Sequence, residues 1–398
     1  MKIIHTSDWH LGHTLYNHDR IDEFRHFFDQ LETIVADETP DALLVSGDIF
    51  DVSSPSSTVA KMMKEELLAI RALSPSMTII VTAGNHDSAS RIDVDRQLWR
   101  VGGIHVLGGV SRNGRDYDFS ENIIRVGDKG YVAAIPFVNS IYMPRPEEGG
   151  KPERRFFWEV AKALEWKNTD GLPAVLMAHL AVENSDLRGH ADSMIGGIDW
   201  VSSECFGPAF DYVALGHIHK PQTFDGGRIA YSGTPVAISF DEDFPHSVNV
   251  VTIAKDQPVE ARTVEITQLR PLRLFPEEAV GYKEALRKLK KLDKDDDCYI
   301  RLHIDRTDPI PADCSEECVK AVKEKKARFC TFKIEEDKQK RDAEKLPEMT
   351  VSEFTEASPT EIAKRYLSSL ADINDETLEK YAAMIDEIRN DIAVENQI

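Results

Sequence analysis

The chain has 398 residues, of which 41% are hydrophobic, so it is long enough for two or three domains with apolar cores. Its formal net charge of −21 is the reverse of the basic surface expected of a protein that holds nucleic acid unaided. No apolar stretch approaches the roughly 18 residues needed to cross a bilayer, and the amino terminus shows no signal-peptide pattern. We therefore expect a soluble, cytoplasmic protein with no membrane partner.

Five apolar runs of strand type are each followed by residues that commonly bind metal ions. The runs span residues 1–4, 43–45, 79–81, 174–177 and 212–215. The residues that follow them are, in order, Asp8 and His10, then Asp48 and Asp51, then Asn85 and His86, then His179, and finally His217 and His219. Because the carboxyl ends of neighbouring strands meet at one edge of an open α/β sheet, these side chains are expected to converge.

Amphipathic helices are predicted between these strands. Apolar residues recur on one side of residues 21–35, and a second helix is expected near residues 59–73. A third is expected after residues 84–87, with Ile92, Leu98 and Trp99 as its apolar positions. Alternation of strands and helices predicts an α/β fold, a layered α/β sandwich.

The number of candidate ligands indicates how many ions are bound. Seven residues exceed what one ion takes: Asp8, His10, Asp48, Asn85, His179, His217 and His219. Carboxylate, amide and imidazole groups together suit manganese, iron or zinc. Two ions sharing one carboxylate would use all seven, and such a centre activates water and neutralises phosphate charge for displacement at phosphorus. His86 diverges from Asn85 beside it, so it is free to face the phosphate as an acid or an electrostatic stabiliser.

Each of these segments also has an ordinary explanation. A single Asp-x-His is usually a turn or a cap, Gly-Asp after a strand is common turn chemistry, and His179 alone would fit a hydrogen-bonded core histidine. Five such segments in this order, each at the end of a strand, favour a metal centre.

The same motifs resemble a known superfamily. Asp-x-His, Gly-Asp-x-x-Asp, Gly-Asn-His-Asp, a separate His and Gly-His-x-His form the pattern of the calcineurin-like metallophosphoesterases. Residues 6–12, 214–219, 231–235 and 239–242 are similar to the SbcD-type nuclease subunits within it. The resemblance is strong over residues 1–245 and weaker beyond. One departure is Ala178 before His179, where relatives often carry Gly.

The resemblance implies how the ligands are shared. It implies one manganese ion on Asp8, His10, Asp48 and His219, and a second on Asp48, Asn85, His179 and His217. Asp48 is then the bridge, and magnesium is an alternative to manganese. His86 takes the phosphate-facing role. Asp51 is expected either to support the ligands from the substrate side or to cap a helix.

The resemblance also implies a function. It implies a DNA nuclease subunit for repair, recombination and replication, acting as a 3'–5' exonuclease on duplex ends and an endonuclease on hairpins or single strands. A homodimer and an SMC-like ABC ATPase of SbcC type are the implied partners. The chain has no Gly-x-x-x-x-Gly-Lys-Ser/Thr loop, so ATP would be handled by that partner. Two alternatives stay open: hydrolysis of small phosphodiesters or phosphomonoesters, and a scaffold without chemistry.

The chain changes in character after Pro271, which sets the expected domains. Residues 1–270 are expected to form the nuclease domain, and short helix-like and strand-like pieces predict a small α+β domain over residues 271–346. By resemblance the latter is a capping domain that reads the DNA end, although an accessory domain without substrate contact is equally compatible with the sequence. Residues 347–398 are expected to be a helical segment.

That last segment carries a heptad-like seam. Apolar residues recur at alternating steps of three and four, at Leu378, Tyr381, Ile385, Ile388 and Ile392. The seam packs either on its own domain or on a partner helix. The resemblance implies that it holds the coiled coil of the ATPase.

Two further features carry weaker signals. Cationic residues in expected loops are candidate DNA contacts or ordinary solvated side chains: Arg112, Arg115, Arg145, Lys151, Arg154 and Arg155. Cys314 and Cys318 lie four residues apart without a matching pair or histidine, so we expect reduced thiols there.

Overall fold

The computed structural model describes residues 1–114, 116–139, 143–144, 150–189, 200–255 and 257–335, and the single positions Thr360, Glu361, Lys380, Tyr381 and Met384. It divides into two compact units. Unit 1 comprises Met1–Arg273 and Asp297–Ile300, and unit 2 comprises Leu274–Asp296 and Arg301–Ile398. Within the described residues, no helix is both long enough and apolar enough to span a bilayer.

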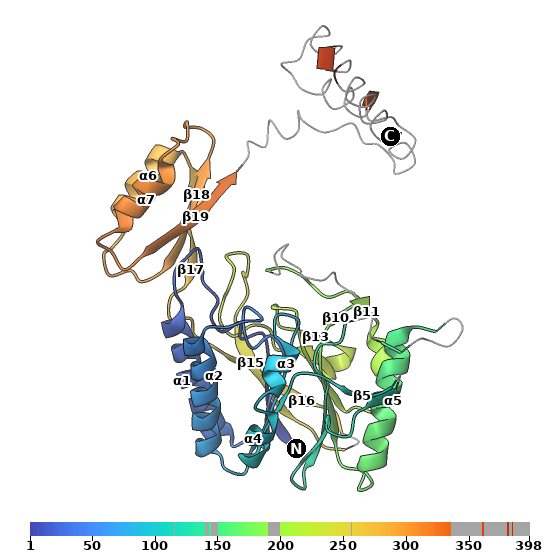
Figure 1. Ribbon diagram of the computed structural model, residues 1–398. Coiled ribbons are helices and arrows are strands. Elements are labelled where there is room, and N and C mark those ends of the chain that lie inside the picture. The colour runs from blue at the N-terminus through green and yellow to red at the C-terminus, as the bar shows by residue number, and fades with distance from the viewer. Residues whose placement is uncertain are drawn as a thin grey trace. The chain divides into compact units, whose positions relative to one another are not determined.

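Unit 1 is built on two six-stranded sheets (Figure 1). The order in sheet 1 is β16 (Glu260–Glu265), β15 (Ser247–Thr252), β1 (Lys2–Thr6), β2 (Ala42–Ser46), β3 (Thr78–Thr82) and β4 (Ile104–Leu107). The order in sheet 2 is β13 (Gln222–Phe224), β14 (Ile229–Tyr231), β12 (Tyr212–Gly216), β9 (Ala174–His179), β8 (Gly130–Ala134) and β7 (Ile123–Val126). Strands β1 to β4 are parallel to one another, as are β8, β9, β12 and β14, so several carboxyl ends share an edge in each sheet.

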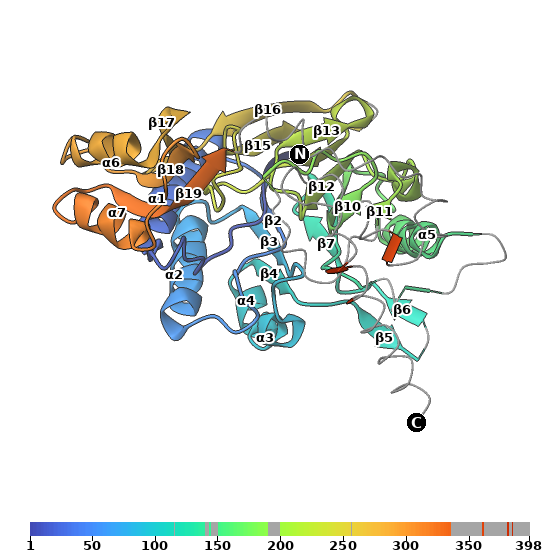
Figure 2. The same ribbon diagram turned by 90° about the horizontal axis from the view of Figure 1, so that it is seen from above.

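Helices cover the outer faces of the two sheets (Figure 2). Helices α1 (Ile21–Glu38) and α2 (Ser57–Leu73) share an apolar core with sheet 1, and α5 (Pro152–Lys167) shares one with sheet 2. A third core, with side chains such as Leu44 and Met177, lies between the sheets. The central strands are therefore buried on both faces, which explains their continuous apolar runs. The predicted α/β sandwich is confirmed.

Polar groups also join the two sheets near their carboxyl ends. Ser46 donates its hydroxyl to the carbonyl of Ala214, at 3.1 Å. His5 Nε2 lies 3.1 Å from the carbonyl oxygen of Leu215, and its Nδ1 lies 3.0 Å from the Tyr212 hydroxyl. Burial lowers the pKa of His5 to about 3, so this ring stays neutral and has a structural role.

The third predicted helix was wrong as a single element. The chain forms two short helices there, α3 (Ala89–Asp93) and α4 (Arg96–Val101). Ile92 and Trp99 are buried as expected, but Leu98 is exposed. Leu98 directly precedes Trp99 in α4 and lies six residues after Ile92, so helical spacing turns it away from the face that Ile92 and Trp99 share.

Unit 2 is a three-stranded sheet with two helices. Its strands are β17 (Leu272–Val280), β18 (Tyr299–Asp305) and β19 (Arg328–Glu335), with β18 in the middle. The first two residues of β17 and of β18 belong to unit 1. The helices of unit 2 are α6 (Tyr282–Lys290) and α7 (Cys314–Val322). Helix α6 ends in a turn rich in lysine and arginine, which suits the negative end of a helix dipole. Cys314 and Cys318 lie on α7, and both are free thiols.

A buried charged cluster fixes the segment Asp297–Ile300 within unit 1. Tyr299 donates its hydroxyl to Glu23 of α1 at 2.7 Å, and Arg270 approaches the same oxygen at 3.1 Å. The guanidinium of Arg20 lies 5.3 Å from the centre of the Tyr299 ring and donates to the carbonyl of Ala237. Glu23 is buried, so its charge depends on these neighbours.

Replacing Tyr299 with Phe should remove one donor from this buried carboxylate. We expect the free energy of unfolding to fall by about 1–3 kcal/mol, the cost of an unsatisfied buried acceptor. Urea denaturation of the full chain would measure it. Tyr16→Phe is the matched control, because Tyr16 is exposed and its loss of a hydroxyl should change stability little. Equal stability of the two variants would contradict the role assigned to Tyr299.

Candidate metal centre

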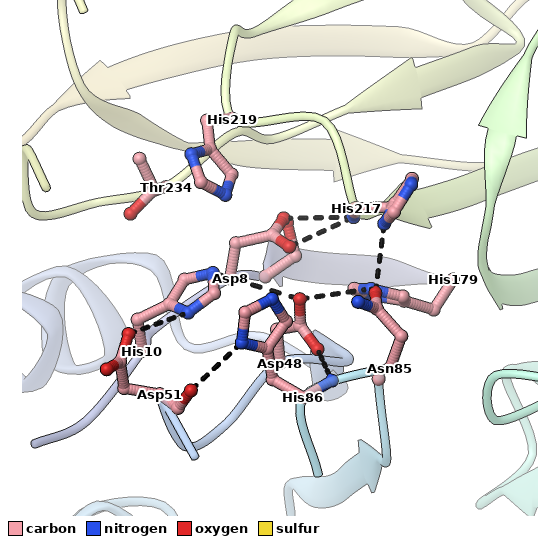
Figure 3. A network of polar contacts seen from close by, with 12 residues as sticks. Asp8, His10, Asp48, Asp51, Asn85, His86, His179, His217, His219 and Thr234 are labelled. Atoms are coloured by element: carbon pink, nitrogen blue, oxygen red, sulfur yellow. Dashed lines mark hydrogen bonds and ion pairs between the residues drawn. The ribbon is translucent and has the colours of Figure 1, made fainter. Parts of the chain in front are cut away.

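The strand-end residues predicted from the sequence lie together in unit 1 (Figure 3). Sheet 1 contributes the residues after β1, β2 and β3, and sheet 2 contributes those at the ends of β9 and β12. The residues in this group are Asp8, His10, Asp48, Asp51, Asn85, His86, His179, His217 and His219. Most of them are buried, so the group forms a polar site inside an otherwise apolar sandwich.

The backbone at this site is strained. Asp8, His10, Asp48 and His217 all have positive φ, between 46° and 100°, where residues other than glycine are uncommon. Gly47 also has φ +87°, and a Cβ there would lie 2.1 Å from Nδ1 of His179. Such strain persists only where surrounding contacts impose it, and it is typical of functional sites.

A first group of possible ligands comprises Asp8, His10 and His219, whose ligand atoms lie within 4.8 Å of one another. The Asp8 carboxylate accepts the backbone N–H of His217 at 2.9 Å, which fixes its direction. Among the described residues, neither ring nitrogen of His10 makes a hydrogen bond, although both are buried. Nε2 of His10 lies 3.8 Å from Asp48.

A second group comprises Asp48, His179 and His217. Nε2 of His179 lies 3.3 Å from the Asp48 carboxylate, and its Nδ1 faces the carbonyl of Ser46 at 2.9 Å. The amide oxygen of Asn85 lies 2.9 Å from His179 and 3.0 Å from His217, so it points into the same group. Asp48 therefore lies between the two groups.

A third group comprises His10, Asp51 and His86. The carboxylate of Asp51 lies 3.5 Å from Nδ1 of His10, and its backbone carbonyl lies 2.9 Å from Nδ1 of His86. The backbone N–H of His86 donates to Asp48 at 2.9 Å. His86 is therefore oriented by two residues of the strand-end loop after β2, at the edge of the other two groups.

Comparison with known proteins matches the part of the chain that holds these residues to one family. Residues 1–221 match the family described as calcineurin-like phosphoesterase, which is more than half of the chain. The chain belongs to the calcineurin-like phosphoesterase family.

Several relatives are similar over about two thirds of the chain. The SbcD subunit of nuclease SbcCD from Rhodobacter capsulatus is 36% identical over 272 residues, covering 64% of this chain and 67% of the relative. The proteins of the same name from Bacillus subtilis and Escherichia coli are 31% and 30% identical, covering 68% and 67% of this chain and 71% and 69% of the relatives. The chain is thus similar to SbcD-type members of the calcineurin-like phosphoesterase family.

The residues present fit a pair of divalent metal ions. Among the described residues, Nε2 of His10 is buried without a hydrogen bond and lies beside Asp48, and the other donors of the first two groups, together with Asn85, are carboxylate, imidazole or amide groups. Such donors suit divalent ions of the manganese and zinc type. This calcineurin-like phosphoesterase therefore carries donor groups that suit divalent metal ions.

The charges of the site respond to its burial and to one another. Burial alone would lower the pKa of His10 and His179, but facing carboxylates outweigh burial and raise both pKa values to about 9. Burial would likewise raise the pKa of Asp48, yet His179 and His10 hold it well below its usual range. Without metal, the imidazoles thus carry protons that compensate Asp48.

Two supporting carboxylates were missed as functional residues. Glu242 is buried and lies 3.0 Å from Nδ1 of His219, so it fixes the direction of that ring. Asp87 accepts the backbone N–H groups of Ile49, Phe50 and Gly84, and so joins the loops after β2 and β3. Burial and Asp48 raise the pKa of Asp87 to about 6. Asp87 is the last residue of the family motif at residues 84–87, and Glu242 is the last residue of the motif at residues 239–242. Their place in these motifs was the sequence signal that could have identified them as functional residues.

Of the other predicted contact residues, some are described and some lie outside the described residues. Tyr381 is exposed, and Leu378, Ile385 and Ile388 lie outside the described residues. Arg154 and Arg155 were expected in a loop, but they lie in the first turns of α5, because Pro152 starts that helix. Arg115 and Arg145 also lie outside the described residues.

Metal binding should weaken as the pH falls. The pKa values of His10 and His179 are about 9, so below that pH an ion must displace a proton from each ring that it uses. The apparent affinity for manganese should therefore drop by up to about tenfold per pH unit for each displaced proton. Titration calorimetry of metal-free protein at pH 6.5, 7.5 and 8.5 would measure this, and buffers of different ionisation enthalpy would count the protons. An affinity that is independent of pH would contradict the charge state assigned to the metal-free site.

Proposed function

We propose that this protein is the nuclease subunit of a DNA-processing complex and hydrolyses phosphodiester bonds with two manganese ions. The observation that carries the proposal is the pair of ligand groups that meet at Asp48, in a chain similar to the SbcD subunit of nuclease SbcCD in three bacteria. Asp8, His10, Asp48 and His219 would hold one ion, and Asp48, Asn85, His179 and His217 the other. Magnesium is an alternative occupant.

The site residues have separate roles in the proposed hydrolysis. When bound, the ions would lower the pKa of an attacking water and neutralise charge on the phosphate oxygens. Asp8 and His219 are held by the His217 backbone and by Glu242, so their ligand atoms are fixed before substrate arrives. Asp51 orients His10 with its carboxylate and His86 with its carbonyl, which makes it a positioning residue.

His86 is proposed to act on the phosphate itself. Its Nδ1 faces a carbonyl oxygen, which only accepts, so Nδ1 carries a proton. Nε2 is then an acceptor in the neutral ring and a donor in the imidazolium. Protonation of the leaving oxygen, or stabilisation of the transition-state charge, therefore requires the imidazolium form of His86.

The proposal extends to substrates and domains. We propose 3'–5' exonuclease action on duplex ends and endonuclease action on hairpins and single strands, in repair, recombination and replication in the cytoplasm. Residues 1–270 would be the nuclease domain, residues 271–346 a capping domain for DNA ends, and residues 347–398 a helical segment for an SbcC-type ATPase. Hydrolysis of small phosphodiesters or phosphomonoesters is the alternative, and the same metal groups would support it.

A homodimer is part of the proposal. Val94, Leu98 and Val101 are 77%, 74% and 90% exposed at the surface of α3 and α4. Three large apolar side chains so close in sequence are unusual on a free surface and are typical of an interface. A second copy with the same patch would bury them by two-fold symmetry.

Replacing His86 with Ser should separate chemistry from metal binding. We expect both ions to stay bound while turnover falls by roughly two to four orders of magnitude, because only the phosphate-facing group is lost. Manganese content, cleavage of end-labelled duplex and cleavage of a chromogenic phosphodiester would be measured together. His26→Ser is the matched control, because His26 lies on α1 away from the ligand groups.

The possible outcomes separate the alternatives. Loss of metal in the His86 variant would make His86 a ligand instead. Cleavage of the chromogenic ester by the unmodified protein, with no cleavage of DNA in the presence of the ATPase, would favour the small-substrate alternative. Absence of any tight manganese site would favour a scaffold.

Charged substitutions in the carboxy-terminal seam should test the partner. If Ile385 and Ile388 pack on a partner helix, the double change to Glu would bury unpaired charge in that interface and prevent co-purification with the ATPase. Manganese binding and cleavage of single strands should persist. Co-purification, metal analysis and melting temperature would be measured on the full-length variant. A lower melting temperature with the partner still bound would place the seam in its own core.

A further inference from the structure

The outer face of α5 carries an alternating row of cationic and aromatic side chains. Arg154, Trp158, Lys162 and Trp166 follow one another at steps of four, so they share one face of the helix. The opposite face, with Phe157, Val160 and Leu164 among others, packs in the core of sheet 2. Both ribbon views show α5 at the outer edge of unit 1 (Figures 1 and 2).

The two indoles in this row are unusually exposed. Trp158 is 59% exposed and Trp166 is 80% exposed, whereas in the same unit Trp9 and Trp99 are buried and Trp200 is 40% exposed. Tryptophan is among the largest apolar side chains, and on average it is highly buried in folded proteins. Two such rings on one helix face therefore call for a ligand rather than for a role in folding.

The cations of the row are available to an anion. Nζ of Lys162 lies 5.8 Å from the centre of the Trp158 ring, so a positive charge lies beside an exposed aromatic face. Its ion pair with Glu165 at 2.7 Å and that of Arg154 with Glu204 at 3.8 Å lie at the surface. Exposed pairs of this kind are weak, so a phosphate could replace the carboxylates at small cost.

The helix ends at a cationic cavity. Lys167, the last residue of α5, donates to the backbone carbonyls of Ser120 and Ile123 at the wall of a cavity of about 150 Å³. The other charged residues of its lining are Arg96, Arg100, Arg125 and Glu121. Glu121 pairs with Arg96 at 3.1 Å and Arg100 at 3.5 Å, and Asp170 pairs with Arg125 at 3.0 Å. The cavity lining thus holds four cations and one carboxylate, so the positive charge of the row on α5 continues there. This is a local excess of positive charge in a chain whose net charge is −21.

We propose that the outer face of α5 binds single-stranded nucleic acid, at a surface separate from the metal centre. Bases would stack on Trp158 and Trp166, and phosphates would contact Arg154, Lys162 and the cavity at the end of the helix. Stacking platforms interleaved with cations are how proteins hold single strands without reading their sequence.

The spacing of the row favours this occupant. Eight residues separate the two indoles, which is about 12 Å along the helix. That distance corresponds to three or four base steps at the ~3.4 Å rise of a stacked strand, with Lys162 between them for the phosphates. An acidic protein segment would satisfy the cations, but it has no flat groups to cover both indoles.

Binding of a fluorescein-labelled twelve-residue oligothymidylate to the full chain in EDTA would test the proposal. We expect quenching of indole fluorescence on binding. Trp158→Ala with Trp166→Ala should weaken binding tenfold or more, since stacking on an aromatic ring contributes about 1–3 kcal/mol per base. Trp158→Phe with Trp166→Phe should largely restore it, because the stacking faces remain. Lys162→Ala should reduce both the affinity and its salt dependence.

Matched controls keep this test independent of catalysis. Lys61→Ala, at an exposed lysine of α2 that pairs with Glu65, should leave binding unchanged. Cleavage of a chromogenic phosphodiester with manganese should also be unchanged in the α5 variants, so a failure of the metal centre would be seen separately. Equal oligonucleotide affinity in the double alanine variant and the unmodified protein would overturn the proposal. If the double alanine variant lost binding to poly-glutamate but kept its binding to the oligonucleotide, this result would overturn the proposal and favour an acidic protein partner.

Discussion

The structure depends on one buried carboxylate. Asp48 lies where the carboxyl ends of two sheets meet, within 4 Å of His10 and His179, and it accepts the backbone N–H of His86. An isolated charge in that position would be costly, so the imidazoles around it must carry protons or share metal with it. The cores, the sheet order and the strained loops together serve to bring those groups to Asp48. In this chain, the geometry of the site therefore depends directly on the fold.

Much of the site could be predicted from the sequence because parallel strands impose a simple rule. Apolar runs buried on both faces identify the central strands, and their carboxyl ends meet at one edge, so Asp8, Asn85 and His217 could be grouped without a structure. The left-handed backbone at four site residues could not be predicted, because their side chains do not favour it and only tertiary contacts impose it. These residues are Asp8, His10, Asp48 and His217. Glu242 was missed for a related reason: its contact with His219 joins residues that no local pattern relates.

The acidic composition is compatible with phosphate chemistry once charge is considered locally. A bound pair of metal ions would supply concentrated positive charge at the centre, where carboxylates are needed as ligands. Cations gather instead along α5 and around the cavity at its end, where exposed pairs leave them exchangeable. Net charge thus describes long-range repulsion of nucleic acid, whereas separate positive surfaces would decide where contact is made.

The segment Asp297–Ile300 has a practical consequence for dissecting the protein. It belongs to unit 1, although the residues on both sides of it belong to unit 2, so the chain passes between the units three times. A fragment ending near residue 270 would lack Tyr299 and leave the buried Glu23 short of a donor. Enzymology on such a fragment would report on a damaged α1 as well as on the missing unit. A split or circularly permuted chain that keeps this four-residue segment with unit 1 would be the faithful way to isolate the catalytic half.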